Sequence, residues 1–165
     1  MKRKITKYAL KKATEHIFYE TAMFYKTLAF LTQQPSQIEV NILLDAFAIH
    51  TRNLFNFFYP KKKIKDDDMS VSHFIDKPSN FSRNKTKKKD LFFVVRKANK
   101  QVAHLTYARN RYNQKTKIWY FVDVGKKMSK TLIAFYEVLP DSYKNWDYIK
   151  KLKEVIDTYH SDKMG

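Results

Sequence analysis

The sequence predicts an all-α protein, a single helical bundle of about five helices over residues 1–165. Glycine occurs only at Gly125 and Gly165, so few turns that need a positive φ angle are encoded. Between the prolines, apolar residues recur at helical spacing. Interior proline breaks a helix, so four positions mark the expected boundaries: Pro35, Pro60, Pro78 and Pro140.

The first two helices are expected at residues 6–31 and from Ser36 to Pro60. Ser36 followed by Glu39 forms the pattern of a capping box at the start of the second helix. This helix is apolar on nearly all sides, which indicates a central position. Asp45 and Arg52 share one of its faces, and we expect them to form a buried ion pair.

Residues 60–90 interrupt the helical pattern with lysine and aspartate blocks and two prolines, and we expect a long basic loop between the second and third helices. A short apolar plug, "VSHFI", is expected to pin this loop to the body. Asp66, Asp67 and Asp68 lack the alternating spacing and the glycine of a calcium loop, so no metal site is predicted.

The third helix is expected at about residues 90–108, with His104 at the border of its apolar stripe. The segment 117–124 has strand propensity, but no partner strand is evident, so a helix start is preferred there. The fourth helix carries Val124 to Leu139, and the fifth carries Trp146 to Tyr159. His50 is expected to pack in the core, while His16 and Glu20 form an i,i+4 pair on the first helix.

Charge points to the class of partner. The chain carries 33 Lys and Arg against 16 Asp and Glu, a net charge of +17. A surface of this kind attracts polyanions, with nucleic acid as the first candidate and an acidic membrane as the second. No stretch reaches the ~20 apolar residues of a membrane span, and no signal peptide is predicted from the basic N-terminal segment.

Cysteine is absent, which excludes disulfides, a Cys zinc site and a thiol nucleophile, and fits a reducing, cytoplasmic compartment. No phosphate-loop or dinucleotide fingerprint is present, so no cofactor is predicted.

The segment around His104 is the candidate site for chemistry. No acidic residue lies between Asp90 and Asp123. An imidazole in a cationic field can exchange protons with a ribose hydroxyl, while arginine stabilises charge on a phosphate. Arg96, the nearest arginine before His104, is the first candidate for stabilising the phosphate, and Arg52 is the alternative. Contacts to RNA are expected from five further residues: Asn99, Lys100, Tyr107, Arg109 and Arg111.

The "NKQVAH" segment, residues 99–104, resembles the His-bearing motif of the HEPN superfamily (higher eukaryotes and prokaryotes nucleotide-binding domains). The "HTRNLFNFFYP" and "AHLTYARN" segments also resemble small bacterial proteins of this kind. The resemblance implies a helical bundle, commonly dimeric, and a metal-independent ribonuclease of toxin–antitoxin, abortive-infection or CRISPR systems. The family motif has four to six residues between Arg and His, whereas seven separate Arg96 from His104.

Three interpretations stay open at this point. His104 acts as general acid/base, with Arg96, from its own chain or a second copy, or Arg52 steadying the phosphate. Alternatively the protein is a catalytically silent HEPN-like module that binds nucleic acid or a partner protein. In the third interpretation it is a subunit of a larger assembly, with a protein partner such as an antitoxin. A border histidine that caps the core is the structural alternative for His104 itself.

Overall fold

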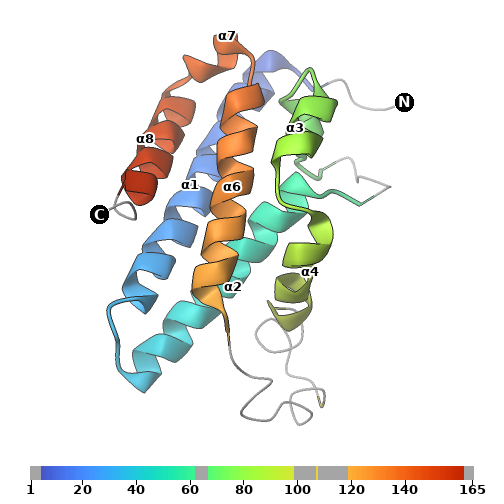
Figure 1. The fold of residues 1–165 in the computed structure, drawn as a ribbon. Coiled ribbons are helices and arrows are strands. Elements are labelled where there is room, and N and C mark those ends of the chain that lie inside the picture. Colours follow the sequence, from blue (N-terminus) through green and yellow to red (C-terminus); the bar gives the residue numbers. More distant parts are fainter. Residues whose placement is uncertain (1–4, 62–66, 99–106, 108–118, 162–165) are drawn as a thin grey trace.

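The computed structural model describes residues 5–61, 67–98, 107 and 119–161, and every regular element within them is helical (Figure 1). The prediction of an all-α bundle is therefore confirmed. Two of the helices, α3 and α7, are short ones that the sequence did not predict. The described α-helices are α1 Lys7–Leu31, α2 Gln37–Phe58, α3 Pro78–Asn84, α4 Lys88–Lys97, α6 Phe121–Val138, α7 Asp141–Lys144 and α8 Asp147–Ser161.

Helices α1 and α2 form an antiparallel hairpin, against which α6 and α8 pack on one side and α4 on another (Figure 1). The predicted capping box opens α2: Ser36 Oγ accepts from the Glu39 amide, and the Glu39 carboxylate accepts from the Ser36 amide at 2.8 Å. At the start of α1, Thr6 Oγ1 accepts a single hydrogen bond from the Ala9 amide. The helix start at the strand-prone segment is also confirmed, since α6 begins at Phe121.

The core is an aromatic cluster at the junction of α2, α3 and α6. Phe135 of α6 is fully buried, and its ring lies 5.5 Å from the rings of both Phe57 and Phe58. Phe74 and Phe81 extend the cluster from the segment after α2. Burial of each such side chain contributes about 1.5–3 kcal/mol, so this cluster is a main source of stability.

The prediction of a loop through residues 60–90 is wrong for much of its length. Within the described part of this range, Val71–His73 form a short 3₁₀ turn, α3 spans Pro78–Asn84, and α4 begins at Lys88. The charge blocks and prolines of this segment predict a loop, but several side chains between them are buried. The predicted plug is confirmed, because Val71, Phe74 and Ile75 are all buried.

Helix α2 is not buried along its whole length. Its second half lies in the core through Phe47, Leu54 and Phe58, whereas Ile38 and Ile42 in its first half are 73% and 63% exposed. Some of the apolar residues of α2 therefore lie in the core, and others face solvent. The central position predicted for this helix holds only for the second half.

Candidate nucleic-acid interface

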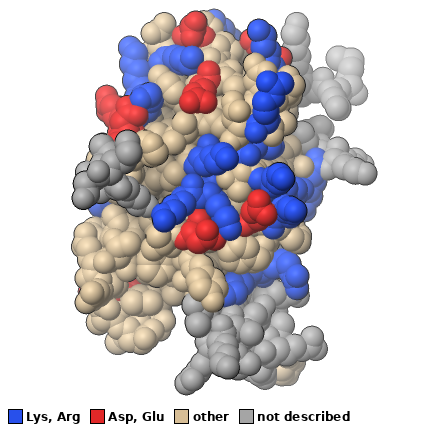
Figure 2. Space-filling model, in the orientation of Figure 1, with Lys and Arg blue, Asp and Glu red and all other residues tan. Residues whose placement is uncertain are grey.

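Figure 2 shows many cationic side chains on the face of the molecule that includes α3, α4 and α6. Acidic residues interrupt this face at a few places, and Asp123 pairs with Lys127 at 2.7 Å. The exposed cations that make up this basic face are Arg83, Lys87, Lys88, Lys89, Lys126 and Lys130.

A buried polar network fixes the link between α3 and α4 on α6. The Tyr59 hydroxyl donates to the Thr86 carbonyl at 2.6 Å, and the Thr86 hydroxyl donates to the Lys127 carbonyl at 2.7 Å. Thr131 Oγ1 accepts from the Thr86 amide at 3.3 Å. Because these groups are buried and bonded to one another, they fix the position of the α3–α4 link, and of the lysines beside it, relative to α6.

Lys85 lies in the same link but points inward. Its ammonium donates to the Phe58 carbonyl at 3.3 Å and lies 4.5 Å and 4.6 Å from the centres of the Tyr59 and Phe81 rings. Burial, followed by the charge of Lys88, lowers the pKa of Lys85. Lys85 therefore forms cation–π contacts at the edge of the aromatic core. We do not count it among the cations that could contact a ligand.

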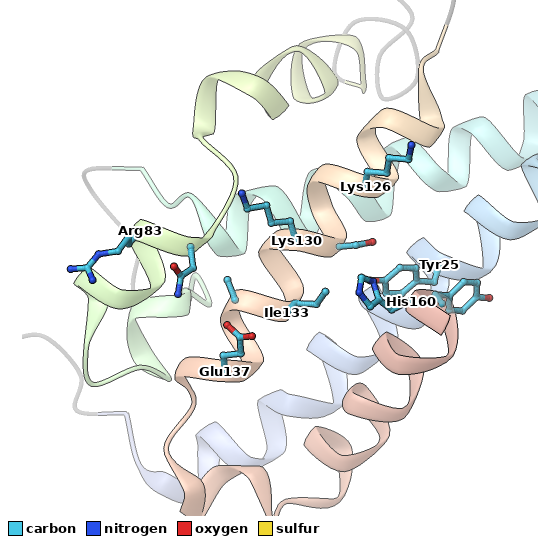
Figure 3. Close-up of a pocket in the computed structure, with 11 residues that line it drawn as sticks. Tyr25, Arg83, Lys126, Lys130, Ile133, Glu137 and His160 are labelled. Carbon is cyan, nitrogen blue, oxygen red and sulfur yellow. The ribbon is translucent and has the colours of Figure 1, made fainter. Parts of the chain in front are cut away.

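A cleft of ≈ 610 Å³ lies between α3 and α8, with the outer face of α6 as its floor (Figure 3). This volume falls within the range of about 300–1,000 Å³ typical of ligand sites. We name it the α6 cleft. Its lining residues are Tyr25, Arg83, Asn84, Lys126, Ser129, Lys130, Ile133, Ala134, Glu137, Tyr159 and His160.

The α6 cleft carries excess positive charge. Its lining contains one carboxylate, Glu137, and three cationic side chains, which are Arg83, Lys126 and Lys130. None of these three cations takes part in the four ion pairs that join described residues. Figure 3 shows Lys126 and Lys130 projecting from neighbouring turns of α6, with Arg83 at the rim and pointing away from that helix. The two lysines lie one helical turn apart and their ammonium groups point in different directions, so positive charge is spread over the outer face of α6.

The opposite wall of the α6 cleft is aromatic. The rings of Tyr25 and Tyr159 stack with centres 4.7 Å apart and planes 11° apart. Burial raises the pKa of Tyr25 to about 12, opposed by its hydrogen bond with Ser129 and reinforced by Tyr159. Tyr25 is thus a neutral phenol at physiological pH, and half-buried Tyr159 is the outer ring of the stack. Aromatic side chains beside lysines are the elements that bind single-stranded nucleic acid.

The described residues among those predicted from the sequence to form the site do not line the α6 cleft. Arg96 is exposed in the last turn of α4, and Tyr107 is 92% exposed. Arg52 is half-buried on α2, which packs on α4 through Phe55 and Phe92. The other predicted residues lie outside the described part of the chain: Asn99, Lys100, His104, Arg109 and Arg111.

A second polar cluster joins α1 to α2. The Glu20 carboxylate lies 2.8 Å from Nδ1 of His50 and accepts from the side-chain Nδ2 of Asn53 at 3.1 Å. His50 is buried, and the edge of the Tyr19 ring packs against it. The predicted Asp45–Arg52 buried pair is wrong, because Asp45 is exposed; the carboxylate that pairs with a buried side chain of α2 is the half-buried Glu20.

Removing the Glu20 carboxylate leaves two donors on α2 without their acceptor. We expect Glu20→Ala to lower the free energy of unfolding by about 2–4 kcal/mol, since each orphaned donor costs about 1–3 kcal/mol. Glu20→Gln keeps one carbonyl oxygen in place and serves as the matched control, with a smaller loss. Urea denaturation of both variants measures the difference; equal losses would show that the cluster contributes shape rather than hydrogen bonding.

Among the residues that the structure describes, no group of three His, Asp or Glu side chains could hold a metal ion. Within the same residues, no helix is long and apolar enough to cross a membrane. Comparisons with protein-family models, with curated proteins and with solved structures found no match to this chain.

Proposed function

We propose that this protein binds nucleic acid, with RNA as the favoured ligand, through the α6 cleft and the basic face around it. The observation that carries the proposal is the pairing of Lys126 and Lys130 with the Tyr25–Tyr159 stack across one cleft. Lysines neutralise backbone phosphates, and aromatic side chains beside them can stack on bases. The preference for RNA over DNA is supported by the HEPN resemblance of the segment around His104.

Binding is tested by fluorescence anisotropy with labelled single-stranded RNA and DNA of the same sequence at several salt concentrations. We expect the logarithm of the affinity to fall linearly with the logarithm of the salt concentration, because phosphate contacts release counterions. An affinity that is weak and insensitive to salt would instead support the interpretation as a subunit that contacts acidic protein.

We further propose that the bound RNA is cut without a metal ion, with His104 exchanging protons and Arg96 or Arg52 steadying the phosphate. In this reaction the ribose 2′-oxygen attacks the adjacent phosphorus and the 5′-oxygen leaves with a proton. The products end in a 2′,3′-cyclic phosphate and a 5′-hydroxyl. This proposal is supported by the sequence alone, namely the acid-free segment between Asp90 and Asp123 and the HEPN resemblance.

His104→Ala is expected to lower the cleavage rate by about 10²–10⁴-fold, the usual contribution of general acid–base catalysis. The assay uses labelled RNA in EDTA, with the thermal melt of the variant as a control for folding. Cleavage that persists in this variant would remove His104 from the mechanism. Retention of RNA without cleavage by the wild-type protein would favour the catalytically silent HEPN-like binding module.

A further inference from the structure

Two exposed polar side chains in the lining of the α6 cleft have no hydrogen bond or ion pair to any other residue that the structure describes. They are Asn84, the last residue of α3, and Glu137 on α6. Helix α3 packs on α6, so both residues belong to the same side of the molecule as the basic face. Their polar atoms are therefore available to a ligand in the cleft.

Charge changes sign along the floor of the α6 cleft. Figure 3 shows Lys126 at one end of the lining face of α6 and Glu137 at the other, with Lys130 and Ile133 between them. At the usual rise of an α-helix, Lys126 and Glu137 are roughly 16 Å apart along the axis. A phosphate is attracted to the lysines and repelled by the carboxylate. An RNA strand therefore places its backbone at the lysine end, which leaves the Glu137 end for a base.

We propose that Glu137 selects guanine in the bound single-stranded RNA, an inference that rests on the proposed function of the α6 cleft. An ionised carboxylate accepts hydrogen bonds and donates none. Guanine is the RNA base that carries two adjacent donors, N1–H and the N2 amino group, on its Watson–Crick edge. These two donors match the two oxygens of one carboxylate.

The other three bases fit an acceptor of this kind less well. Adenine and cytosine each place one amino donor beside a ring nitrogen that is an acceptor, and uracil places one N3–H between two carbonyl oxygens. Each of these bases therefore brings an acceptor towards one oxygen of Glu137. The third group on the Watson–Crick edge of guanine is the O6 acceptor, and the Asn84 side chain supplies an amide donor in the lining of the same cleft. Single-stranded RNA exposes this edge to protein side chains.

Selection is tested by fluorescence anisotropy with the full chain and short oligouridylates that carry one central test base. We expect guanosine to bind at least about fivefold more tightly than adenosine, cytidine or uridine, the discrimination of a bidentate contact. Inosine lacks the N2 amino group and is expected to lose most of this preference. Guanosine with carbon in place of N7 keeps both donors and is expected to retain it.

The variant Glu137→Gln keeps the length of the side chain but replaces one acceptor oxygen with a donor. We expect this variant to bind the guanosine and uridine oligomers with nearly equal affinity. Glu154→Gln is the matched control, because Glu154 is exposed on α8 and does not line the α6 cleft. Both variants remove one negative charge, so they change the general attraction of phosphate alike. Both positions are exposed, and a thermal melt of each variant checks the fold.

The results separate this inference from the proposed function. If every oligomer binds equally well to the wild-type protein, RNA binding stands and guanine selection is overturned. If no oligomer binds, the proposed function fails and the inference fails with it. A guanosine preference that survives Glu137→Gln, or that depends on N7 and not on the N2 amino group, removes Glu137 from base selection. Displacement of the guanosine oligomer by an equal concentration of guanosine monophosphate would assign the site to a free nucleotide and overturn its assignment to RNA.

Discussion

Replacing Lys126 and Lys130 together with Glu is expected to weaken RNA binding by at least about tenfold and to reduce its salt dependence. Both side chains are exposed on the floor of the α6 cleft, so their charge acts on a ligand and not on the core. Each lost phosphate contact lowers the slope of log affinity against log salt by about one. Anisotropy titrations with single-stranded RNA at several salt concentrations measure the affinity and the slope together.

The matched control is Lys150→Glu with Lys151→Glu on α8. This pair changes the net charge of the protein by the same amount, and both lysines are exposed but do not line the α6 cleft. A small effect of the control and a large effect of the cleft variant would locate binding in the cleft. If both variants weaken RNA equally, attraction is set by the total charge of the protein and the α6 cleft has no special role.

Phe135→Ala is expected to destabilise the fold by about 3–5 kcal/mol, the usual cost of removing a buried phenyl ring. Phe135 is fully buried and lies within 5.5 Å, centre to centre, of the rings of Phe57 and Phe58. Its ring also meets Phe74, so the cavity opens at the junction of α2, α6 and the segment between them. Guanidinium denaturation followed by circular dichroism measures the loss.

Phe92→Ala serves as the comparison for this core position, because Phe92 is 47% exposed on α4. We expect it to cost about 1 kcal/mol or less, since little surface is returned to water. Similar losses in the two variants would mean that Phe135 does not anchor the cluster. Because the proposed RNA site depends on the packing of α3 against α6, the Phe135 variant is also expected to bind RNA more weakly near its melting temperature.

Much of the helical architecture could be predicted because its signals are local. The Ser36–Glu39 capping box lies within one turn of chain, and both of its hydrogen bonds form as predicted. The start of α6 followed from the absence of a partner strand for residues 117–124. The apolar spacing of Val124, Met128, Leu132 and Phe135 marked the buried face of α6, and all four are fully buried.

Features that depend on how helices face one another could not be predicted. Periodicity shows which residues of α2 share a face, but it does not show which helix covers that face. Periodicity therefore predicts a buried Asp45–Arg52 pair, whereas the packing of α1 on α2 brings Glu20 to His50. For the same reason the central position predicted for α2 does not hold for its exposed first turns, where Ile38 and Ile42 face solvent.

The α6 cleft was missed because its residues are far apart in the sequence. Arg83, Lys126 and His160 come from three helices, and Tyr25 comes from a fourth. One local signal was available: Lys126, Lys130, Ile133 and Glu137 recur on the side of α6 opposite to its buried stripe. That signal predicts an exposed face with two lysines, but it contains no information about the tyrosine stack across the cleft.

Lysine footprinting tests the central claim, that RNA lies in the α6 cleft, most directly. The protein is acetylated briefly with and without saturating single-stranded RNA, and modification at each lysine is measured by mass spectrometry. We predict that acetylation of Lys126 and Lys130 falls several-fold when RNA is bound, while Lys150 and Lys151 on α8 react at the same rate. Bound RNA that leaves Lys126 and Lys130 fully reactive would contradict the account.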